Sequence, residues 1–426
     1  MKEIVLEFDK LVGEGKALGR AGGKVVFSYG VLPGEKAKIR VLKEKRNFIE
    51  GEAVEIISPS KERIEPREDH YLSCSPWQII KYPYQAESKK KIAQDLYFQT
   101  VKETVPVDDF FCAQDIFGYR TKIEYSFTQT QEGLSFAFHK RGAYWQKLTL
   151  PEGCALISPK VNAAAIKILN RLRENKITCD KLKSLILRRA GNPEKVIACL
   201  FSKDKDLKFS AQGIEELSGF TVAWSNPLSP MSSADEILSK EGEDFLSEEI
   251  CGMSFDYGFD CFFQNNIRLF ETALREIKNY GKDFGNTLDL YCGAGVIGFS
   301  LKDRIKKLLS VEISPSCHKW AVINSQKNSL KNTETLLSAG EKLDSSYFDK
   351  TETIILDPPR AGLHKNVVKN IMTFLPQRII YLSCNPITQG RDALFFLEKY
   401  KISKSACFDF YPNTPHLESL LIFEKK

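Results

Sequence analysis

The strongest constraint on the fold is a repeated alternation of strand-like and helix-like segments from about Phe262 to the end of the chain. Apolar runs typical of buried strands lie at residues 287–291, 307–312, 352–356 and 378–382, and helical patterns separate them. This order predicts an α/β fold with a parallel, doubly wound, Rossmann-like sheet. Because ligands bind at the carboxyl ends of the strands in such sheets, functional residues are expected just after these runs.

The first part of the chain shows short alternating apolar runs between Ile4 and about Ser58, separated by glycine turns. Strands and turns at this spacing predict a small OB-like β-barrel. Six basic residues fall within a short stretch of it, namely Lys36, Lys38, Arg40, Lys43, Lys45 and Arg46. Such a run indicates either a solvated strand face or a surface that binds a polyanion. The charge-rich stretch 61–69 is expected to be a linker.

Residues 89–100 show a helical pattern, and from about 119 to 257 strand-like runs alternate with helical stretches such as 161–175, which predicts a central α+β domain. The length of 426 residues suits two or three domains. We predict a β-barrel over 1–58, a central α+β domain over 67–260 and an α/β domain over 261–426. Part of about 84–118 is expected to pack with the third domain.

Composition favours an ordinary globular protein, with 42% apolar and 27% charged residues. Neither a secretory signal nor a run of eighteen apolar residues is found, which favours a cytoplasmic protein that does not bind membranes. The net charge of +6 only mildly favours a polyanionic partner. The 11 cysteines are scattered singly without a Cys-x-x-Cys pair, so a reducing compartment is expected and a structural zinc site of the usual spacing is not.

A ligand loop is predicted after the strand at 287–291, where Gly293 and Gly295 precede a helix. The glycines allow close approach to the backbone, and the helix offers a positive N-terminus. Glu312, at the end of the next strand, is suited to bind ribose hydroxyls. The Asp357-Pro-Pro turn after the third strand is rigid and acidic. This turn favours S-adenosylmethionine over NAD as the ligand.

Cys384 follows the fourth strand in a polar Ser-Cys-Asn-Pro setting, and Glu418 lies downstream in Pro-His-Leu-Glu. A thiolate and a base are what methylation at carbon 5 of uracil requires. The thiolate adds to carbon 6 to make carbon 5 nucleophilic, and the base later removes the carbon 5 proton. The alternatives are a structural cysteine and a surface carboxylate.

The chain resembles the RNA uracil-5 methyltransferase family that carries a TRAM domain. The barrel resembles that RNA-binding domain in its Gly-x-Gly start, its Pro-Gly-Glu turn and its closing Arg63. Four further motifs occur in family order: 262–264, 289–293, 357–362, and 383–386 with 416–418. The resemblance implies a class I methyltransferase domain and an RNA substrate, with 23S ribosomal RNA favoured over transfer RNA. We expect the protein to act as a monomer.

The resemblance also implies roles for individual residues. Cys384 would be the nucleophile and Glu418 the general base. The methyl donor would contact Gln264, Tyr291, Gly293, Glu312 and Asp357. Arg360 and Phe262 would lie near the target base, although a core position is an almost equal alternative for Phe262. His416 is expected to be a structural neighbour rather than an acid or base.

One departure from the family pattern concerns an iron–sulfur cluster held by four cysteines. Cys74 and Cys154 occupy two of the four positions, whereas Glu68 and Trp77 occupy the others. Four thiolates cannot be assembled from these residues, so we expect no cluster and no bound metal.

Three other functions are alternatives to uracil-5 methylation of RNA. A cytosine-5 methyltransferase is disfavoured by the Pro-His-x-Glu motif near the C-terminus. A non-catalytic RNA-binding or RNA-folding factor would not need both Cys384 and Glu418. A small-molecule methyltransferase would not need the basic barrel.

Overall fold

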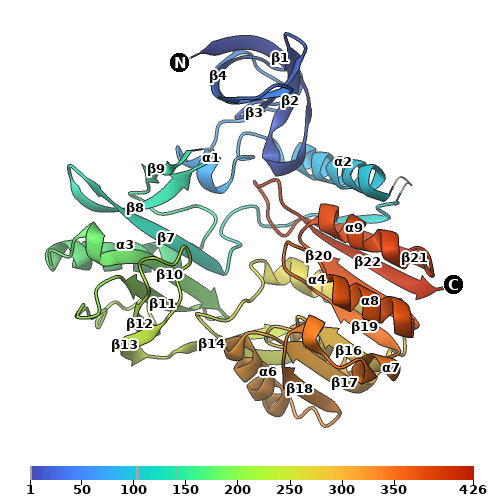
Figure 1. Ribbon diagram of the computed structural model, residues 1–426. Coiled ribbons are helices and arrows are strands. Elements are labelled where there is room, and N and C mark those ends of the chain that lie inside the picture. Colours follow the sequence, from blue (N-terminus) through green and yellow to red (C-terminus); the bar gives the residue numbers. More distant parts are fainter. Residues whose placement is uncertain (1, 102–104, 142) are drawn as a thin grey trace.

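The computed structural model describes residues 2–101, 105–141 and 143–426. It contains a closed β-barrel, a seven-stranded sheet, a two-stranded hairpin and an eight-stranded sheet. In Figure 1 the barrel lies at the top in blue, the seven-stranded sheet on the left in green, and the eight-stranded sheet at the lower right in orange and red.

The barrel has the strand order β1-β2-β3-β5-β4 and encloses an apolar core that includes Phe8, Val26 and Ile39. Its strands are β1 (Glu3–Leu11), β2 (Ala17–Ala21), β3 (Lys24–Tyr29), β4 (Lys36–Glu44) and β5 (Phe48–Ser58). Glu35, which is fully buried, accepts hydrogen bonds from the Arg63 guanidinium at 2.6 and 2.7 Å. This ion pair ties the segment after the barrel to the turn before β4.

The seven-stranded sheet has the order β13-β12-β11-β10-β7-β8-β9 and carries helix α3 (Pro159–Glu174). Ser158 caps this helix by accepting from the Val161 amide, and Pro159 follows it, as expected at a helix N-terminus. The strands are β7 (Lys122–Thr130), β8 (Gly133–Lys140), β9 (Ala143–Thr149), β10 (Leu182–Ala190), β11 (Lys195–Ser202), β12 (Gly219–Trp224) and β13 (Glu236–Gly242), and the hairpin is β14 (Phe245–Ile250) with β15 (Met253–Gly258).

The eight-stranded sheet has the order β18-β17-β16-β19-β20-β22-β21-β6. Strands β16 to β20 are parallel, and the central strands β16, β19 and β20 are buried along almost their whole length, which explains their continuous apolar runs. The bounds are β6 (Asp109–Phe111), β16 (Gly285–Leu290), β17 (Ile305–Glu312), β18 (Thr333–Leu337), β19 (Thr353–Leu356), β20 (Arg378–Ser383), β21 (Tyr400–Phe408) and β22 (Glu418–Lys425). The edge strand β6 comes from far earlier in the chain and pairs with β21.

Helices cover this sheet on both faces (Figure 1). The α-helices outside α3 are α1 (Tyr71–Cys74), α2 (Tyr82–Val101), α4 (Ile267–Tyr280), α5 (Val296–Ser300), α6 (Pro315–Lys327), α7 (Ser346–Asp349), α8 (Lys365–Phe374) and α9 (Pro386–Phe396). Helix α2 packs against α9, and the Tyr97 hydroxyl donates to Gln389 across the contact.

The predicted fold class is confirmed: a barrel, a central α+β part and a Rossmann-like part occur in this order. The four predicted strands are parallel, whereas β22, which was not among them, runs antiparallel to β20 and β21. A connection of the hairpin type leads from β21 to β22, so no crossover helix precedes β22. The domain boundaries at 58, 67 and 260 stay a prediction. Within the described residues, no helix has both the length and the apolar character needed to span a membrane.

Candidate active site

The ends of four parallel strands meet at one edge of the eight-stranded sheet. Leu290 in β16 is paired with Val311 in β17 and with Leu356 in β19, and Leu356 is paired with Tyr381 in β20. Strand order reverses at β16, because β17 lies on one side of it and β19 on the other. Such a reversal opens a crevice at the carboxyl ends, which is where doubly wound sheets bind ligands.

The loop after β16 enters this crevice with left-handed backbone. Tyr291, Gly293 and Gly295 have φ angles of 64°, 58° and 89°. A Cβ atom on Gly295 would come within 2.2 Å of the Phe299 ring, so this position requires glycine. A Cβ on Gly293 would meet nothing within 4 Å, which shows that the backbone there faces open space.

Glu312, at the end of the neighbouring strand β17, binds the loop that follows β16. Its carboxylate accepts hydrogen bonds from the Gly293 amide at 2.9 Å and from the Ser314 amide at 2.7 Å. Beneath it, the fully buried Asp289 accepts from the Gly298 amide at 3.1 Å, and burial raises the pKa of Asp289 to about 8. The two carboxyl groups hold the loop and the start of α5 in register with the strands.

Asp357 and Gln264 lie together at the reversal point. Burial raises the pKa of Asp357 to about 7, and a hydrogen bond with the Gln264 side chain opposes this rise. Gln264 is buried, and within the described structure its Oε1 atom has no hydrogen-bond partner. Phe262, two residues earlier, is 60% exposed, so it is not a core side chain. Its neighbour Phe263 takes the core position instead and stacks on Tyr257.

Cys384 and Glu418 face each other across two adjacent strands. Ser383, the last residue of β20, is paired with Ser419 in the antiparallel strand β22. Cys384 follows Ser383 and Glu418 precedes Ser419, so the two side chains occupy the next pair of positions along the same ladder. The sequence placed them 34 positions apart, and this register brings them together.

Burial dominates the electrostatics of this pair. Burial, and then the Glu418 carboxyl, raise the pKa of the Cys384 thiol to about 11, whereas the Arg360 guanidinium acts to lower it. Burial, and then Asp357, raise the pKa of Glu418 well above its ordinary value. The Tyr411 hydroxyl donates to Glu418 Oε1 at 3.4 Å, while Oε2 is buried without a partner in the described structure. The unliganded site therefore favours an uncharged thiol and an uncharged carboxyl group.

Arg360 is held at the mouth of the site by its neighbours. Its guanidinium lies 3.3 Å from Nδ1 of His416, and its carbonyl oxygen accepts from the Asn385 side chain at 2.9 Å. Burial, and then Arg360, lower the pKa of His416 to about 3. The imidazole is therefore neutral and accepts from Arg360, which supports the interpretation of His416 as a structural neighbour.

Sequence reasoning missed the residues that anchor the segment before Glu418. Lys89 of α2 is fully buried; its ammonium lies 2.5 Å from Asp409 and donates to the Tyr411 carbonyl at 3.0 Å. In the same helix, Gln85 exchanges two hydrogen bonds with Asn413 at 2.9 Å each. The sequence offered only a basic helix here, because partners more than 300 positions away leave no local signal.

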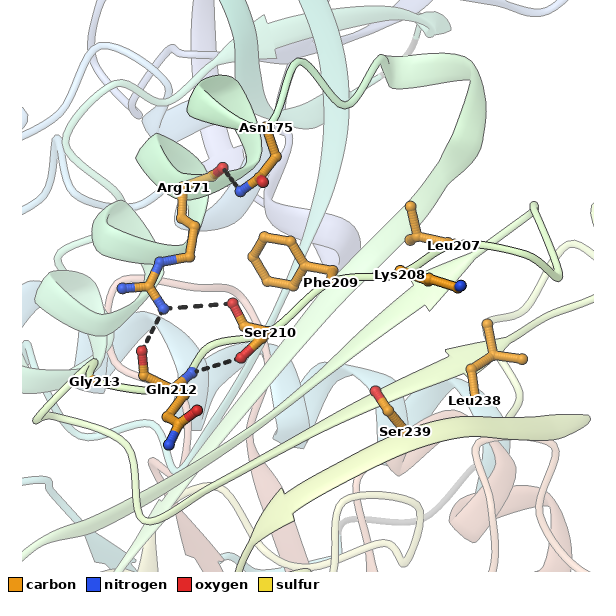
Figure 2. Close-up of a pocket in the computed structure, with 10 residues that line it drawn as sticks. All are labelled: Arg171, Asn175, Leu207, Lys208, Phe209, Ser210, Gln212, Gly213, Leu238 and Ser239. Atoms are coloured by element: carbon orange, nitrogen blue, oxygen red, sulfur yellow. Dashed lines mark hydrogen bonds between the residues drawn. The ribbon is translucent and has the colours of Figure 1, made fainter.

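A separate hollow of about 750 Å³ lies at the surface of the central part (Figure 2). The Arg171 guanidinium is already engaged there by the carbonyl groups of Ser210 and Gln212, at 3.4 and 2.7 Å. The lining residues include no cysteine and no carboxylate. This hollow therefore lacks the chemistry found at the strand ends.

A second cluster of polar side chains lies between the barrel and the central sheet. Glu68, His70, Cys74 and Cys154 place one potential ligand atom each within 4.8 Å of one another. Two cysteines do not fit the four-thiolate site of an iron–sulfur cluster. Trp77, at the other cysteine position, is fully buried, and its indole nitrogen points to the Gly15 carbonyl in the barrel.

Comparisons with known proteins identify the family to which the chain belongs. Residues 81–426 match the family model described as tRNA (Uracil-5-)-methyltransferase. An uncharacterized RNA methyltransferase of Caldanaerobacter subterraneus subsp. tengcongensis is 27% identical, over 99% of this chain and 98% of that protein. One from Thermotoga maritima is 29% identical, over 99% and 98% of the two chains.

Among solved structures, a tRNA (uracil-54, C5)-methyltransferase of Pyrococcus abyssi in complex with S-adenosyl-L-homocysteine has a similar fold. The TM-score is 0.79 at 22% identity, and the alignment covers 99% of this chain and 100% of the other. Together with the family match, this fold leads to one conclusion. The chain belongs to the tRNA (uracil-5-)-methyltransferase family and is an S-adenosylmethionine-dependent RNA (uracil-5-)-methyltransferase.

Proposed function

We propose that the enzyme methylates carbon 5 of a uridine in 23S ribosomal RNA, with Cys384 as the nucleophile and Glu418 as the general base. The observation that carries the two roles is the pairing of Ser383 with Ser419, which sets the thiol opposite the carboxyl group. Arg360, whose charge favours the thiolate, stands beside them.

The donor site fits S-adenosylmethionine. Glu312 would bind the ribose hydroxyls, and the open backbone at Gly293 would contact the remainder of the donor together with Tyr291 and Asp357. The unpartnered Oε1 of Gln264 offers one more buried acceptor. When bound, the donor supplies an electrophilic methyl group on a sulfonium.

The reaction begins when the Cys384 thiol loses its proton to solvent and its sulfur bonds to carbon 6 of the uracil. The electron pair of the C5–C6 double bond moves to carbon 5 and into the neighbouring carbonyl, which makes an enolate. Carbon 5 then takes the methyl group with the electron pair of the enolate, and the bond between the methyl group and the sulfonium sulfur breaks. Glu418, once ionised, is the base that removes the carbon 5 proton, and its raised pKa makes this carboxylate a stronger base than an ordinary one. The double bond then forms again and the thiolate leaves.

Access to carbon 6 requires an unstacked uridine. The exposed ring of Phe262 is available to stack on a flipped or unpaired base, which is worth roughly 1 to 3 kcal/mol. Phe262 and Arg360 are therefore the proposed contacts to the target base.

The basic barrel supports RNA binding, although its charges are partly paired. Lys38 and Arg40 form ion pairs with Glu55 and Glu52. Lys43, Lys45 and Arg46 are exposed around the β4–β5 turn, and no ion pair involves them within the described residues. These three side chains are the proposed phosphate contacts.

Transfer RNA is the second candidate substrate. The whole-chain similarity to a structure named for uracil 54 of tRNA includes the barrel, so the barrel does not by itself separate the two RNAs. The deciding experiment treats total RNA from a strain that lacks the gene with the purified enzyme and maps the new 5-methyluridine. A site in 23S RNA is expected, and a site confined to tRNA would overturn that assignment.

A further inference from the structure

The cluster of Glu68, His70, Cys74 and Cys154 joins two parts of the molecule. Glu68 and His70 lie in the segment just before α1, and Cys74 is the last residue of this short helix. Cys154 comes from the loop between β9 and α3 of the central part. All four potential ligand atoms lie within 4.8 Å of one another.

The donor set suits one tetrahedral zinc ion. Two sulfurs, one imidazole nitrogen and one carboxylate oxygen are all ordinary zinc ligands, and four protein ligands make a closed, structural site. With bonds of about 2.0 to 2.3 Å, atoms on one tetrahedral zinc are about 3.3 to 3.8 Å apart, so side-chain shifts of about 1 Å complete the site.

His70 supplies an independent observation. The side chain is 9% exposed, and its Nε2 atom is buried without a hydrogen bond in the described structure. That nitrogen lies 3.2 Å from Oε1 of Glu68, and although burial lowers the pKa of His70, contacts with Cys74 and Glu68 raise it to about 9. The four groups are therefore closely coupled, and a bound cation would replace the imidazole proton as the positive partner of the carboxylate and the sulfur atoms.

The carboxylate is oriented by groups that would form an outer shell. Glu68 accepts from the Gln78 side chain at 2.8 Å and from the Ala155 amide, next to Cys154. Such outer hydrogen bonds typically fix metal ligands in place. Once the metal has displaced the His70 proton, two thiolates and a carboxylate carry three negative charges, which a divalent cation largely offsets.

The cluster also explains the departure from four cysteines. Trp77 belongs to the core under the barrel and lies under the ammonium of Lys89 at 5.7 Å, so it is not available as a ligand. His70 supplies the fourth ligand atom from a different position. The ligands of a four-iron cluster must leave room between them for a cube of iron and sulfide. The four potential ligand atoms here are close enough together to bind a single ion.

We propose that Glu68, His70, Cys74 and Cys154 bind one Zn²⁺ ion, which fastens the segment after the barrel to the central sheet. This site is separate from the strand-end site, and zinc takes no part in methyl transfer. The cysteine positions alone predicted no metal, and His70 had no part in that prediction.

Elemental analysis of the full chain, purified without chelators, tests the proposal. About one zinc per chain is expected. Protein produced with Co²⁺ instead is expected to show thiolate-to-cobalt charge transfer and the visible bands of tetrahedral cobalt. The variants Cys74→Ser/Cys154→Ser and His70→Gln should each lose the metal, while the matched control Cys112→Ser/Cys179→Ser, at free cysteines outside the cluster, should keep it.

Three results would overturn the proposal. They are wild-type protein that takes up neither Zn²⁺ nor Co²⁺, stoichiometric iron and sulfide after anaerobic purification, and undiminished metal in Cys74→Ser/Cys154→Ser. The cobalt spectrum of the wild-type protein reports thiolate ligation directly, so the test does not depend on the folding of any variant.

Discussion

The buried ion pair between Lys89 and Asp409 gives a quantitative test of how the segment before Glu418 is held. Both side chains have no exposed surface, and 2.5 Å separates the ammonium nitrogen from the carboxylate oxygen. At an effective dielectric constant of about 20, the attraction is about 7 kcal/mol before desolvation. Removal of one partner from a buried pair typically costs about 3 to 5 kcal/mol. Lys89→Met should therefore reduce the free energy of unfolding by at least about 3 kcal/mol.

The double variant Lys89→Met/Asp409→Leu separates the pair from general packing. Loss of both charges leaves the Tyr411 carbonyl without its donor, which costs about 1 to 3 kcal/mol. The double variant should thus be more stable than Lys89→Met. Urea unfolding followed by circular dichroism measures both, and Lys91→Met, at an exposed position in the same helix, should stay within about 0.5 kcal/mol of wild type. A loss below about 1 kcal/mol for Lys89→Met, or additive losses in the double variant, would refute the reasoning.

Three further predictions concern the thiol, the donor site and the barrel. The pKa of Cys384 is raised to about 11, so the fraction of thiolate falls as the pH falls. The single-turnover rate of adduct formation should therefore rise about tenfold per pH unit between about pH 7 and pH 9, and a rate independent of pH would contradict this. Glu312→Ala removes the acceptor of two backbone hydrogen bonds and should raise the calorimetric Kd for S-adenosylmethionine at least about tenfold, whereas unchanged affinity would exclude it from the donor site. Replacement of Lys43, Lys45 and Arg46 by alanine should lower RNA affinity and reduce the log–log salt slope by about 2 to 3, and an unchanged slope would exclude these phosphate contacts.

Much of the fold could be predicted because periodicity is a local property. The four apolar runs coincide with β16, β17, β19 and β20, and the glycine loop follows β16 as expected. The pairing partners of a strand are not local, however. Neither the insertion of β22 between β20 and β21 nor the addition of β6 to the edge has a sequence pattern that specifies it.

The same distinction applies to the sites. Cys384 and Glu418 could be named from their motifs, but their opposition depends on the antiparallel pairing of β20 with β22. Lys89 was visible only as one of several basic residues, since its burial depends on Asp409 from the distant C-terminal segment. His70 carried no signal at all, because a single histidine acquires meaning only beside Cys74 and Cys154.

The most direct test of the central claim uses Glu418→Gln, which keeps the size of the side chain but removes the base. With RNA and S-adenosylmethionine, this variant should accumulate a covalent protein–RNA adduct that survives denaturing electrophoresis, because the thiolate adds to carbon 6 but elimination stalls. The double variant Cys384→Ala/Glu418→Gln should form none. An adduct that forms equally well without the Cys384 thiol would contradict the assignment of the nucleophile.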